Sequence, residues 1–236
     1  MNLNNSTIFE VIRNAFSKDV WGIVTPAIKE TLYMTILTTI FTLILGIGLG
    51  IILVVTDKQG LIPKPVFNKV LGAIVNVLRS LPSMILIILT LPLSRLFIGR
   101  AYGPEACIFA LVASCVPMFG RLVESSILEV AKGKIEAAKA MGTSNFNIIV
   151  KVLVPEALPS LVRAFTIAII AIIATTALAG SFGAGGLGDV AVRFGYSRFK
   201  TDILLAAVLV LIIIVQLVQF IGDSVSKHII KKRFLL

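Results

Sequence analysis

Long uninterrupted apolar stretches dominate the chain and alternate with short polar segments. The first of them, residues 31–55, contains no charged side chain. A helix of this length, at ~1.5 Å rise per residue, exceeds the ~30 Å hydrocarbon thickness of a bilayer and can cross it with some tilt. Four further stretches predict spans at about 74–98, 106–128, 161–179 and 203–221. The pattern therefore predicts an all-α, polytopic membrane protein with five transmembrane helices.

The second predicted span is the least regular one, because Arg79, Ser80, Leu81 and Pro82 interrupt it. The apolar part that follows Pro82 is too short to cross a membrane by itself, so the span must recruit residues from before Arg79 or from beyond Pro92. The Arg79 guanidinium then either snorkels at the cytoplasmic rim or faces the protein interior. Both placements remain open from sequence.

Two local patterns predict contacts within the spans. Gly46 and Gly50 stand four residues apart, with Gly48 between them, and small residues at this spacing permit close approach of another helix. Arg121 and Glu124 stand three residues apart near the end of the third span, which predicts an ion pair on one helix face.

This pattern divides the chain into three regions. Residues 1–27 place apolar and polar side chains at helical spacing, which predicts an amphipathic helix on the membrane surface. They contain no apolar core of the signal-peptide kind, so we expect no cleaved leader. Residues 28–222 form the predicted membrane domain. Residues 223–236 form a basic tail that contains Lys227, Lys231, Lys232 and Arg233.

Composition supports a membrane protein and gives its orientation. Hydrophobic residues make up 57% of the chain and charged residues 14%, with a formal net charge of +10. The cations cluster between apolar runs, as the positive-inside rule predicts, so nucleic-acid binding is the poorer interpretation. Lysine and arginine are more numerous in residues 57–69, 129–159 and 223–236 than on the other side. The amino terminus is therefore expected outside and the carboxyl terminus in the cytoplasm.

The sequence offers no basis for catalysis, metal binding or cofactor binding. Cys107 and Cys115 share one apolar run, where packing is favoured over a disulfide, and His228 is the only histidine. The apolar segments contain no paired carboxylates and no Ser/His/Asp or Cys/His set, so we expect no enzymatic activity of this chain. We likewise predict no metal site and no cofactor.

Glycines at positions 183, 185 and 188 formally match a dinucleotide fingerprint but follow a membrane helix rather than a strand. A phosphate-binding G-x-x-x-x-G-K-[ST] motif does not occur in the sequence, so the chain is not expected to bind ATP. We interpret residues 180–188 as a flexible, tightly packed turn between two membrane helices.

The polar insert 129–159 is the most informative stretch. It contains Glu136-Ala137-Ala138, then Gly142, then a second apolar run that ends at Pro155. The insert has alanines on an exposed helix face, a glycine turn and a second amphipathic helix ended by proline. These features predict a compact projection that fits a groove on another protein. Few ionisable groups lie in the spans, so an ion-coupled carrier is disfavoured and energy should enter through this insert. Three of its lysines could steer an acidic partner surface: Lys132, Lys134 and Lys139.

The spacing of the insert resembles the EAA motif of ABC importer permeases, EAA-x3-G-x9-I-x-L-P. In this chain Val152 and Val154 replace the isoleucine and leucine, which keeps the apolar character. The resemblance covers most of the chain and is greatest to the methionine-import permeases, which have five spans per subunit. The segments that carry it, besides the insert, are Thr31-Leu32-Tyr33-Met34-Thr35, Arg79-Ser80-Leu81-Pro82, Pro155-Glu156-Ala157-Leu158-Pro159 and Gly183-Ala184-Gly185-Gly186-Leu187-Gly188.

This resemblance implies a permease subunit of the bacterial inner membrane that imports methionine or a related small amino acid. Such permeases pair as homodimers with two cytoplasmic ATPase subunits and an external substrate-binding lipoprotein, surrounded by membrane lipid. The residues that would couple to the ATPase are Glu136, Ala137, Ala138, Ala140, Met141 and Gly142.

Polar residues of the irregular second span are our candidates for the substrate pathway: Asn76, Arg79 and Ser80. Two alternative functions remain open. The cargo could be another small solute, such as an osmolyte or an oxyanion, or the chain could be a membrane scaffold that recruits a cytoplasmic partner without transport.

Overall fold

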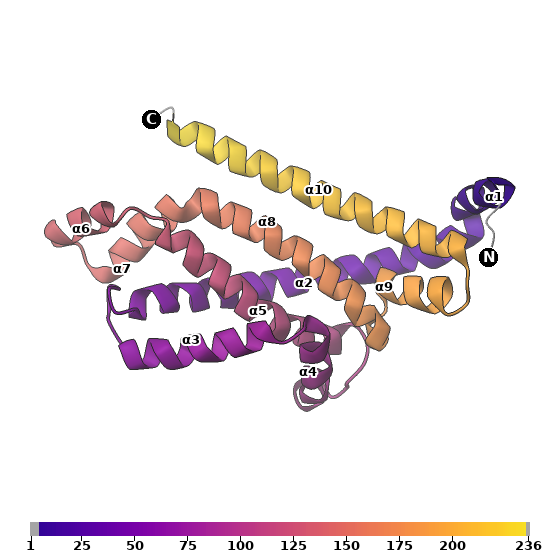
Figure 1. The fold of residues 1–236 in the computed structure, drawn as a ribbon, viewed down its shortest axis with the longest axis horizontal. Helices are drawn as coiled ribbons and strands as arrows, with labels where there is room; N and C mark the ends of the chain where they lie inside the picture. The colour runs from indigo at the N-terminus through magenta and orange to yellow at the C-terminus, as the bar shows by residue number, and fades with distance from the viewer. Residues whose placement is uncertain (1–4, 235–236) are drawn as a thin grey trace. The chain divides into compact units, whose positions relative to one another are not determined.

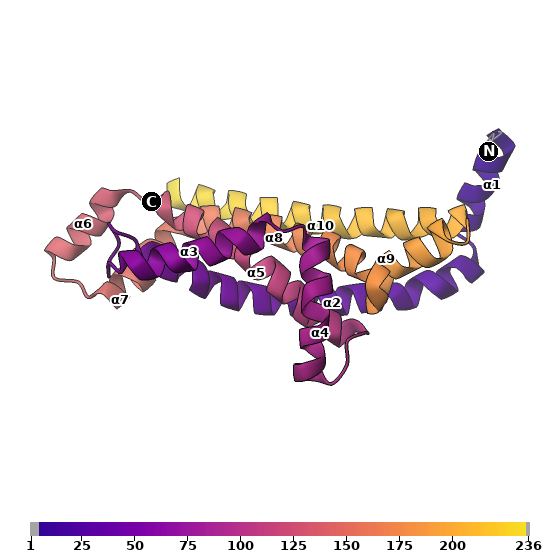
Figure 2. The same cartoon turned by 60° about the horizontal axis from the view of Figure 1, so that its bottom comes forward.

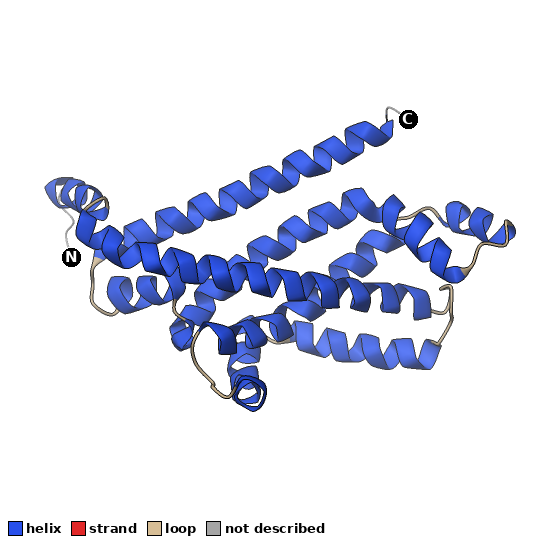
Figure 3. Cartoon of the chain, turned by 180° about the vertical axis from the view of Figure 1, so that it is seen from behind, coloured by secondary structure: helices blue, strands red, loops and turns tan. Residues whose placement is uncertain are grey.

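The described part of the chain, residues 5–234, consists of helices and connecting loops in a computed structural model, with no strand among these residues (Figure 3). Residues 1–4 of the predicted segment 1–27 and residues 235–236 of the predicted tail lie outside the described residues. Side chains are described for residues 9–231, which leaves out Ile8, Lys232 and Arg233. The all-α prediction is confirmed.

The described residues form ten α-helices, and three π-helical turns join some of them; Figure 1 labels the α-helices. The α-helices are α1 (Asn5–Ala15), α2 (Lys18–Thr56), α3 (Pro65–Ser80), α4 (Ser83–Ile98), α5 (Pro104–Leu128), α6 (Lys132–Ala140), α7 (Asn145–Ile148), α8 (Val154–Ala179), α9 (Gly186–Val190) and α10 (Thr201–Phe234). The π-helical turns are η1 (Ile149–Leu153), η2 (Gly180–Ala184) and η3 (Ala191–Tyr196).

Helical stretches long and apolar enough to cross a membrane number 4 among the described residues, or up to 5 when the bent pair α3 and α4 counts as one span. They are Lys18–Thr56, Pro104–Leu128, Asn145–Ala184 and Thr201–Lys231. The predicted spans 31–55, 106–128, 161–179 and 203–221 fall inside these stretches. The predicted span 74–98 is the broken pair.

The break in that span lies at Leu81 and Pro82. Helix α3 ends at Ser80, Leu81 has extended backbone angles (φ −76°, ψ 137°), and α4 begins at Ser83. A proline disfavours helical angles in the residue before it, which accounts for the conformation of Leu81. The expected span over 74–98 is therefore two helices rather than one, and Figure 2 shows α3 and α4 as separate elements.

Contacts divide the chain into two compact units. One comprises 1–39, 83–113 and 170–217, and the other comprises 40–82, 114–169 and 218–236. The second unit packs α5 closely against α2. A Cβ at Gly50 would lie 2.6 Å from the Cβ of Val123, and one at Gly46 would collide with the Phe119 ring, whereas Gly48 has open space. The predicted close approach at Gly46 and Gly50 is confirmed.

The first unit has two apolar cores among its described residues. One gathers side chains of α2, α9 and α10, including Val24, Leu187 and Ala207. The other gathers α2, α4, α5 and the end of α8, and it includes Met34 and Cys107. Cys107 and Cys115 are both buried, which agrees with their predicted role in packing.

Helices extend into both terminal regions. Helix α1 ends at Ala15, and α2 already begins at Lys18, so the predicted amphipathic stretch is divided between two helices. Phe9 of α1 and Phe16 of the turn that follows it are both exposed. At the other end, α10 continues to Phe234, so the described part of the predicted tail is helical.

Candidate functional site: the coupling loop and the broken span

Helices α6 and α7 project beyond the ends of α5 and α8, in the second unit (Figure 1). We call residues 129–159 the coupling loop. Helix α6 carries the Glu-Ala-Ala sequence, and Met141 ends it.

Gly142 reverses the chain between α6 and α7. Its φ is +74°, in the left-handed region that glycine adopts without strain. The Gly142 N–H donates to Lys139 O at 2.9 Å, and the Thr143 N–H donates to Ala138 O at 3.1 Å, which together form a Schellman ending of α6. A Cβ at Gly142 would meet nothing within 4 Å. Glycine is therefore needed here for its backbone angles rather than for space.

The turn exposes some predicted coupling residues and buries one. Met141 is 77% exposed, and Glu136, Ala137 and Ala140 are also exposed. Ala138 is only 3% exposed and belongs to the core of the second unit. The expectation that all the alanines lie on an exposed face was wrong for Ala138, because α6 turns this small side chain toward the core.

The second helix of the loop does not end at Pro155, contrary to the sequence-based expectation. Helix α7 passes through the π-helical turn η1 into α8, and this continuous stretch runs on into the fourth predicted span. Pro155 is the second residue of α8. A proline is tolerated in the first turn of a helix, so the chain continues through it.

Side-chain contacts join the two halves of the coupling loop and anchor the loop to the rest of its unit. The Lys134 ammonium pairs with the Glu156 carboxylate at 2.7 Å, and Lys132 Nζ donates to Gln59 Oε1 at 2.9 Å. Ser160 donates a hydrogen bond to Glu129. Two of the three lysines expected to steer a partner thus make internal contacts. These anchors disfavour the interpretation of the loop as a merely solvated connection.

A cavity of about 310 Å³ lies beside α6. Its apolar lining includes the buried side chains Ile127 and Leu153, and its charged lining includes Asp57, Glu136 and Lys139. Glu136 therefore lies on the exposed face of α6 and also lines this partly apolar cavity. Among the described residues no group of three or more His, Cys, Asp or Glu side chains could hold a metal ion.

The three pathway candidates lie together at the end of α3, next to the break. Asn76, Arg79 and Ser80 are all exposed, and the Ser80 hydroxyl donates to Val77 O at 2.8 Å. Within the described side chains, no hydrogen bond or ion pair to Arg79 is found. An unpaired guanidinium in a membrane-spanning segment is costly against lipid. This cost favours a protein surface or an aqueous path beside Arg79.

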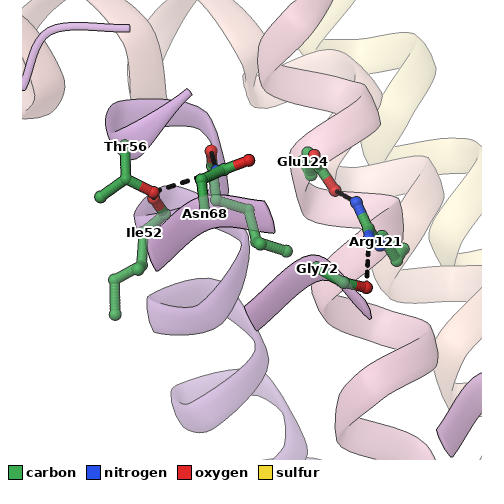
Figure 4. A network of polar contacts seen from close by, with 7 residues as sticks. Ile52, Thr56, Asn68, Gly72, Arg121 and Glu124 are labelled. Carbon is green, nitrogen blue, oxygen red and sulfur yellow. Dashed lines mark hydrogen bonds and ion pairs between the residues drawn. The ribbon is translucent and has the colours of Figure 1, made fainter. Parts of the chain in front are cut away.

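The start of α3 is held by polar contacts of its neighbours (Figure 4). Arg121 pairs with Glu124 at 2.6 Å, which confirms the predicted local ion pair, and its other terminal nitrogen donates to Gly72 O at 2.9 Å. Asn68 Nδ2 donates to Leu53 O at 2.6 Å and to Thr56 Oγ1 at 3.0 Å. The broken span therefore begins from a fixed position within the second unit.

Sequence reasoning missed Glu30 and Thr31, which bond to a distant segment of the first unit. Glu30 Oε2 accepts from the Gly186 N–H at 2.7 Å, and Thr31 Oγ1 accepts from the Leu187 N–H at 2.8 Å. A usable signal was present, because a carboxylate at the edge of a long apolar run needs a polar partner.

Comparison with known proteins shows the family of this chain. Residues 46–234 match the family described as "Binding-protein-dependent transport system inner membrane component". The chain belongs to this family. As such a component, the permease is a multi-pass protein of the inner membrane, and it is not the catalytic subunit of the system. The predicted resemblance to ABC importer permeases is confirmed, and the alternative of a non-transporting scaffold is disfavoured.

Individual relatives are similar over most of their length. The permease is 41% identical over 200 residues to the probable D-methionine transport system permease protein MetI of Vibrio cholerae, which covers 85% of this chain and 89% of the relative. It is 44% identical over 207 residues to the methionine import system permease protein MetP of Bacillus subtilis, covering 88% and 93%.

Solved structures give the same fold. A chain in inward-facing conformations of the MetNI methionine ABC transporter superposes with a TM-score of 0.88 at 35% identity, covering 91% of the permease and 99% of that chain. An amino acid ABC transporter crystallised with histidines superposes with a TM-score of 0.71 at 13% identity, which shows a shared fold alone.

Proposed function

We propose that the permease forms the translocation path of an ATP-driven importer for methionine or a closely related amino acid. The observation that carries this proposal is the similarity to methionine-transport permeases over more than four fifths of the chain, together with the matching fold. The permease works as a homodimer with two ATPase subunits and receives its cargo from an external substrate-binding protein.

Energy enters through the coupling loop in this proposal. Glu136, Ala137, Ala140 and Met141 are the exposed residues that would contact the ATPase, and Gly142 fixes the turn that presents them. Ala138 supports α6 from the buried side. The loop lies in the cytoplasm, with the amino terminus outside and the carboxyl terminus inside, because the loop side carries more lysine and arginine.

The path itself runs past the end of α3. A guanidinium presents a planar set of donors that matches a carboxylate, so Arg79 can receive the α-carboxylate of an amino acid. Asn76 and Ser80 lie on the same turns of α3. The Asn76 amide can donate a further hydrogen bond to the passing solute, and the Ser80 oxygen, whose O–H already donates to Val77 O, can accept one. The same exposed cation would also suit an oxyanion, which keeps an oxyanion importer as the second candidate.

The cargo is tested with the permease, its ATPase and its binding protein reconstituted in liposomes. ATP-driven uptake of labelled methionine is measured against a panel of unlabelled competitors. We expect excess methionine to reduce uptake by more than about tenfold, as direct competition requires. Glycine betaine, sulfate and phosphate should leave uptake unchanged. Absence of ATP-driven uptake of labelled methionine, while the same complex takes up labelled sulfate or labelled betaine, would contradict the proposed cargo.

A further inference from the structure

The segment that follows α8 is closely packed rather than loose. We call residues 180–188 the glycine segment. A Cβ at Gly185 would lie 2.5 Å from Glu30 Oε2, and one at Gly186 would lie 2.7 Å from Thr31 Oγ1. Both glycines have φ near +80°. Glycine is needed at these two positions for the backbone angles and also for the space that the side chains of α2 occupy.

Helix α9 takes its amino-terminal hydrogen-bond acceptors from another helix. Its cap residue, Gly185, has no side chain, so the first N–H groups of α9 lack a local acceptor. Glu30 and Thr31 of α2 supply the missing acceptors for Gly186 and Leu187. Thr31 is 1% exposed, and Gly186 and Leu187 are buried, so the Thr31 contact is shielded from water. Glu30 is exposed, so its contact with Gly186 is shielded only in part.

A third contact holds the same segment. The Gly103 N–H, which precedes α5, donates to Gly183 O at 3.0 Å. The glycine segment is thereby fixed to the start of α5 as well as to α2, and all of these residues belong to the first unit.

This contact lies at the far end of the helix that leaves the coupling loop. Helix α8 runs without interruption from the coupling loop at Val154 to Ala179, and the glycine segment follows its far end. A rigid helix passes a displacement of one end to the elements to which its other end is attached. Glu30 and Thr31 provide such an attachment, because they bind the segment into which α8 leads.

We propose that Glu30 and Thr31 are positioning residues that clamp the glycine segment and so allow α8 to convert movement of the coupling loop into transport. This inference rests on the proposed function as an importer. Loss of the clamp should uncouple the complex, so that ATP hydrolysis continues while less solute enters for each ATP consumed.

The test compares two double variants in the reconstituted complex. Glu30→Leu with Thr31→Val removes both acceptors at similar volume, whereas Glu30→Gln with Thr31→Ser keeps an acceptor oxygen at each position. We expect the first variant to reduce solute imported per ATP by about tenfold or more, as the loss of a charge-assisted hydrogen bond allows. The second variant keeps an acceptor at each position but loses the charge, so its ratio should lie between those of the first variant and wild type. Lys29→Gln changes an exposed neighbour and serves as the control.

Amide hydrogen exchange tests the hydrogen bonds to Glu30 and Thr31 independently of transport. The N–H groups of Gly186 and Leu187 should exchange at least about tenfold faster in the Leu/Val variant, with the middle of α8 unchanged. Thr31→Val alone, a milder change, should give a smaller effect in the same direction. Unchanged exchange in the Leu/Val variant, or an unchanged ratio of solute to ATP, would overturn the proposal. A wild-type complex without uptake would instead contradict the proposed function.

Discussion

Replacing Gly142 with valine is expected to reduce ATP-driven uptake by more than about tenfold, because a left-handed backbone costs an ordinary residue roughly 1–2 kcal/mol and a β-branched one more. The Gly142 φ of +74° forms the reversal that presents Glu136 and Met141. Relief of the strain would change this reversal and misplace the contact with the ATPase. Asparagine tolerates the left-handed region better, so Gly142→Asn should retain most of the uptake.

Uptake, ATP hydrolysis and the amount of membrane-inserted protein are measured together for these variants. Space is open at Gly142, so the valine variant should insert normally while uptake falls. Gly133→Ala is the control, because Gly133 lies in α6, which the turn at Gly142 follows, has open space and lacks a positive φ. Wild-type uptake by Gly142→Val would show that this turn does not carry the coupling.

Replacing Arg79 with alanine should reduce the maximal rate of uptake by about 10- to 100-fold, the factor expected when a charged donor to a carboxylate is lost. Arg79→Lys should recover part of the rate, because lysine keeps the charge but loses the planar set of donors. Asn76→Ala and Ser80→Ala remove neutral hydrogen-bonding groups, so each should cost about 10-fold or less.

The rate of uptake is measured at saturating substrate-loaded binding protein, so that affinity for the external protein does not limit it. Arg95→Ala provides the control, since Arg95 is another exposed arginine near the end of its helix, α4. Normal kinetics in Arg79→Ala would remove the end of α3 from the proposed path.

Local patterns in the sequence predicted much of this fold. The apolar runs located the membrane-spanning helices, because hydrophobic length alone decides whether a helix can cross a bilayer. The ion pair of Arg121 with Glu124 and the close approach at Gly46 and Gly50 depend on spacing along one helix, and both were predictable.

Contacts between residues far apart in the sequence were not predictable in this way. The burial of Ala138 follows from the packing of α6 on a core shared with Ile148 and Leu153. The contacts of Glu30 and Thr31 join residues 156 positions apart, and no local pattern encodes such a pairing. For this reason the glycine segment could be predicted as a turn, but not as a clamped one.

The break at Leu81 and Pro82 shows the same limit at shorter range. Proline predicts an altered backbone in the preceding residue, yet hydropathy does not distinguish a kinked span from two separate helices. The break sets Asn76, Arg79 and Ser80 at a helix end, where their side chains are exposed.

The central claim is that the permease has a path for solute but no energy source of its own, and that the ATPase drives it through the coupling loop. The most direct test measures methionine uptake in liposomes that contain the permease and binding protein, with the ATPase present or omitted and with ATP supplied on either side. We predict uptake only when the ATPase is present and ATP lies on the side of the coupling loop. Accumulation by the permease without the ATPase, or with ATP only on the opposite side, would contradict the account.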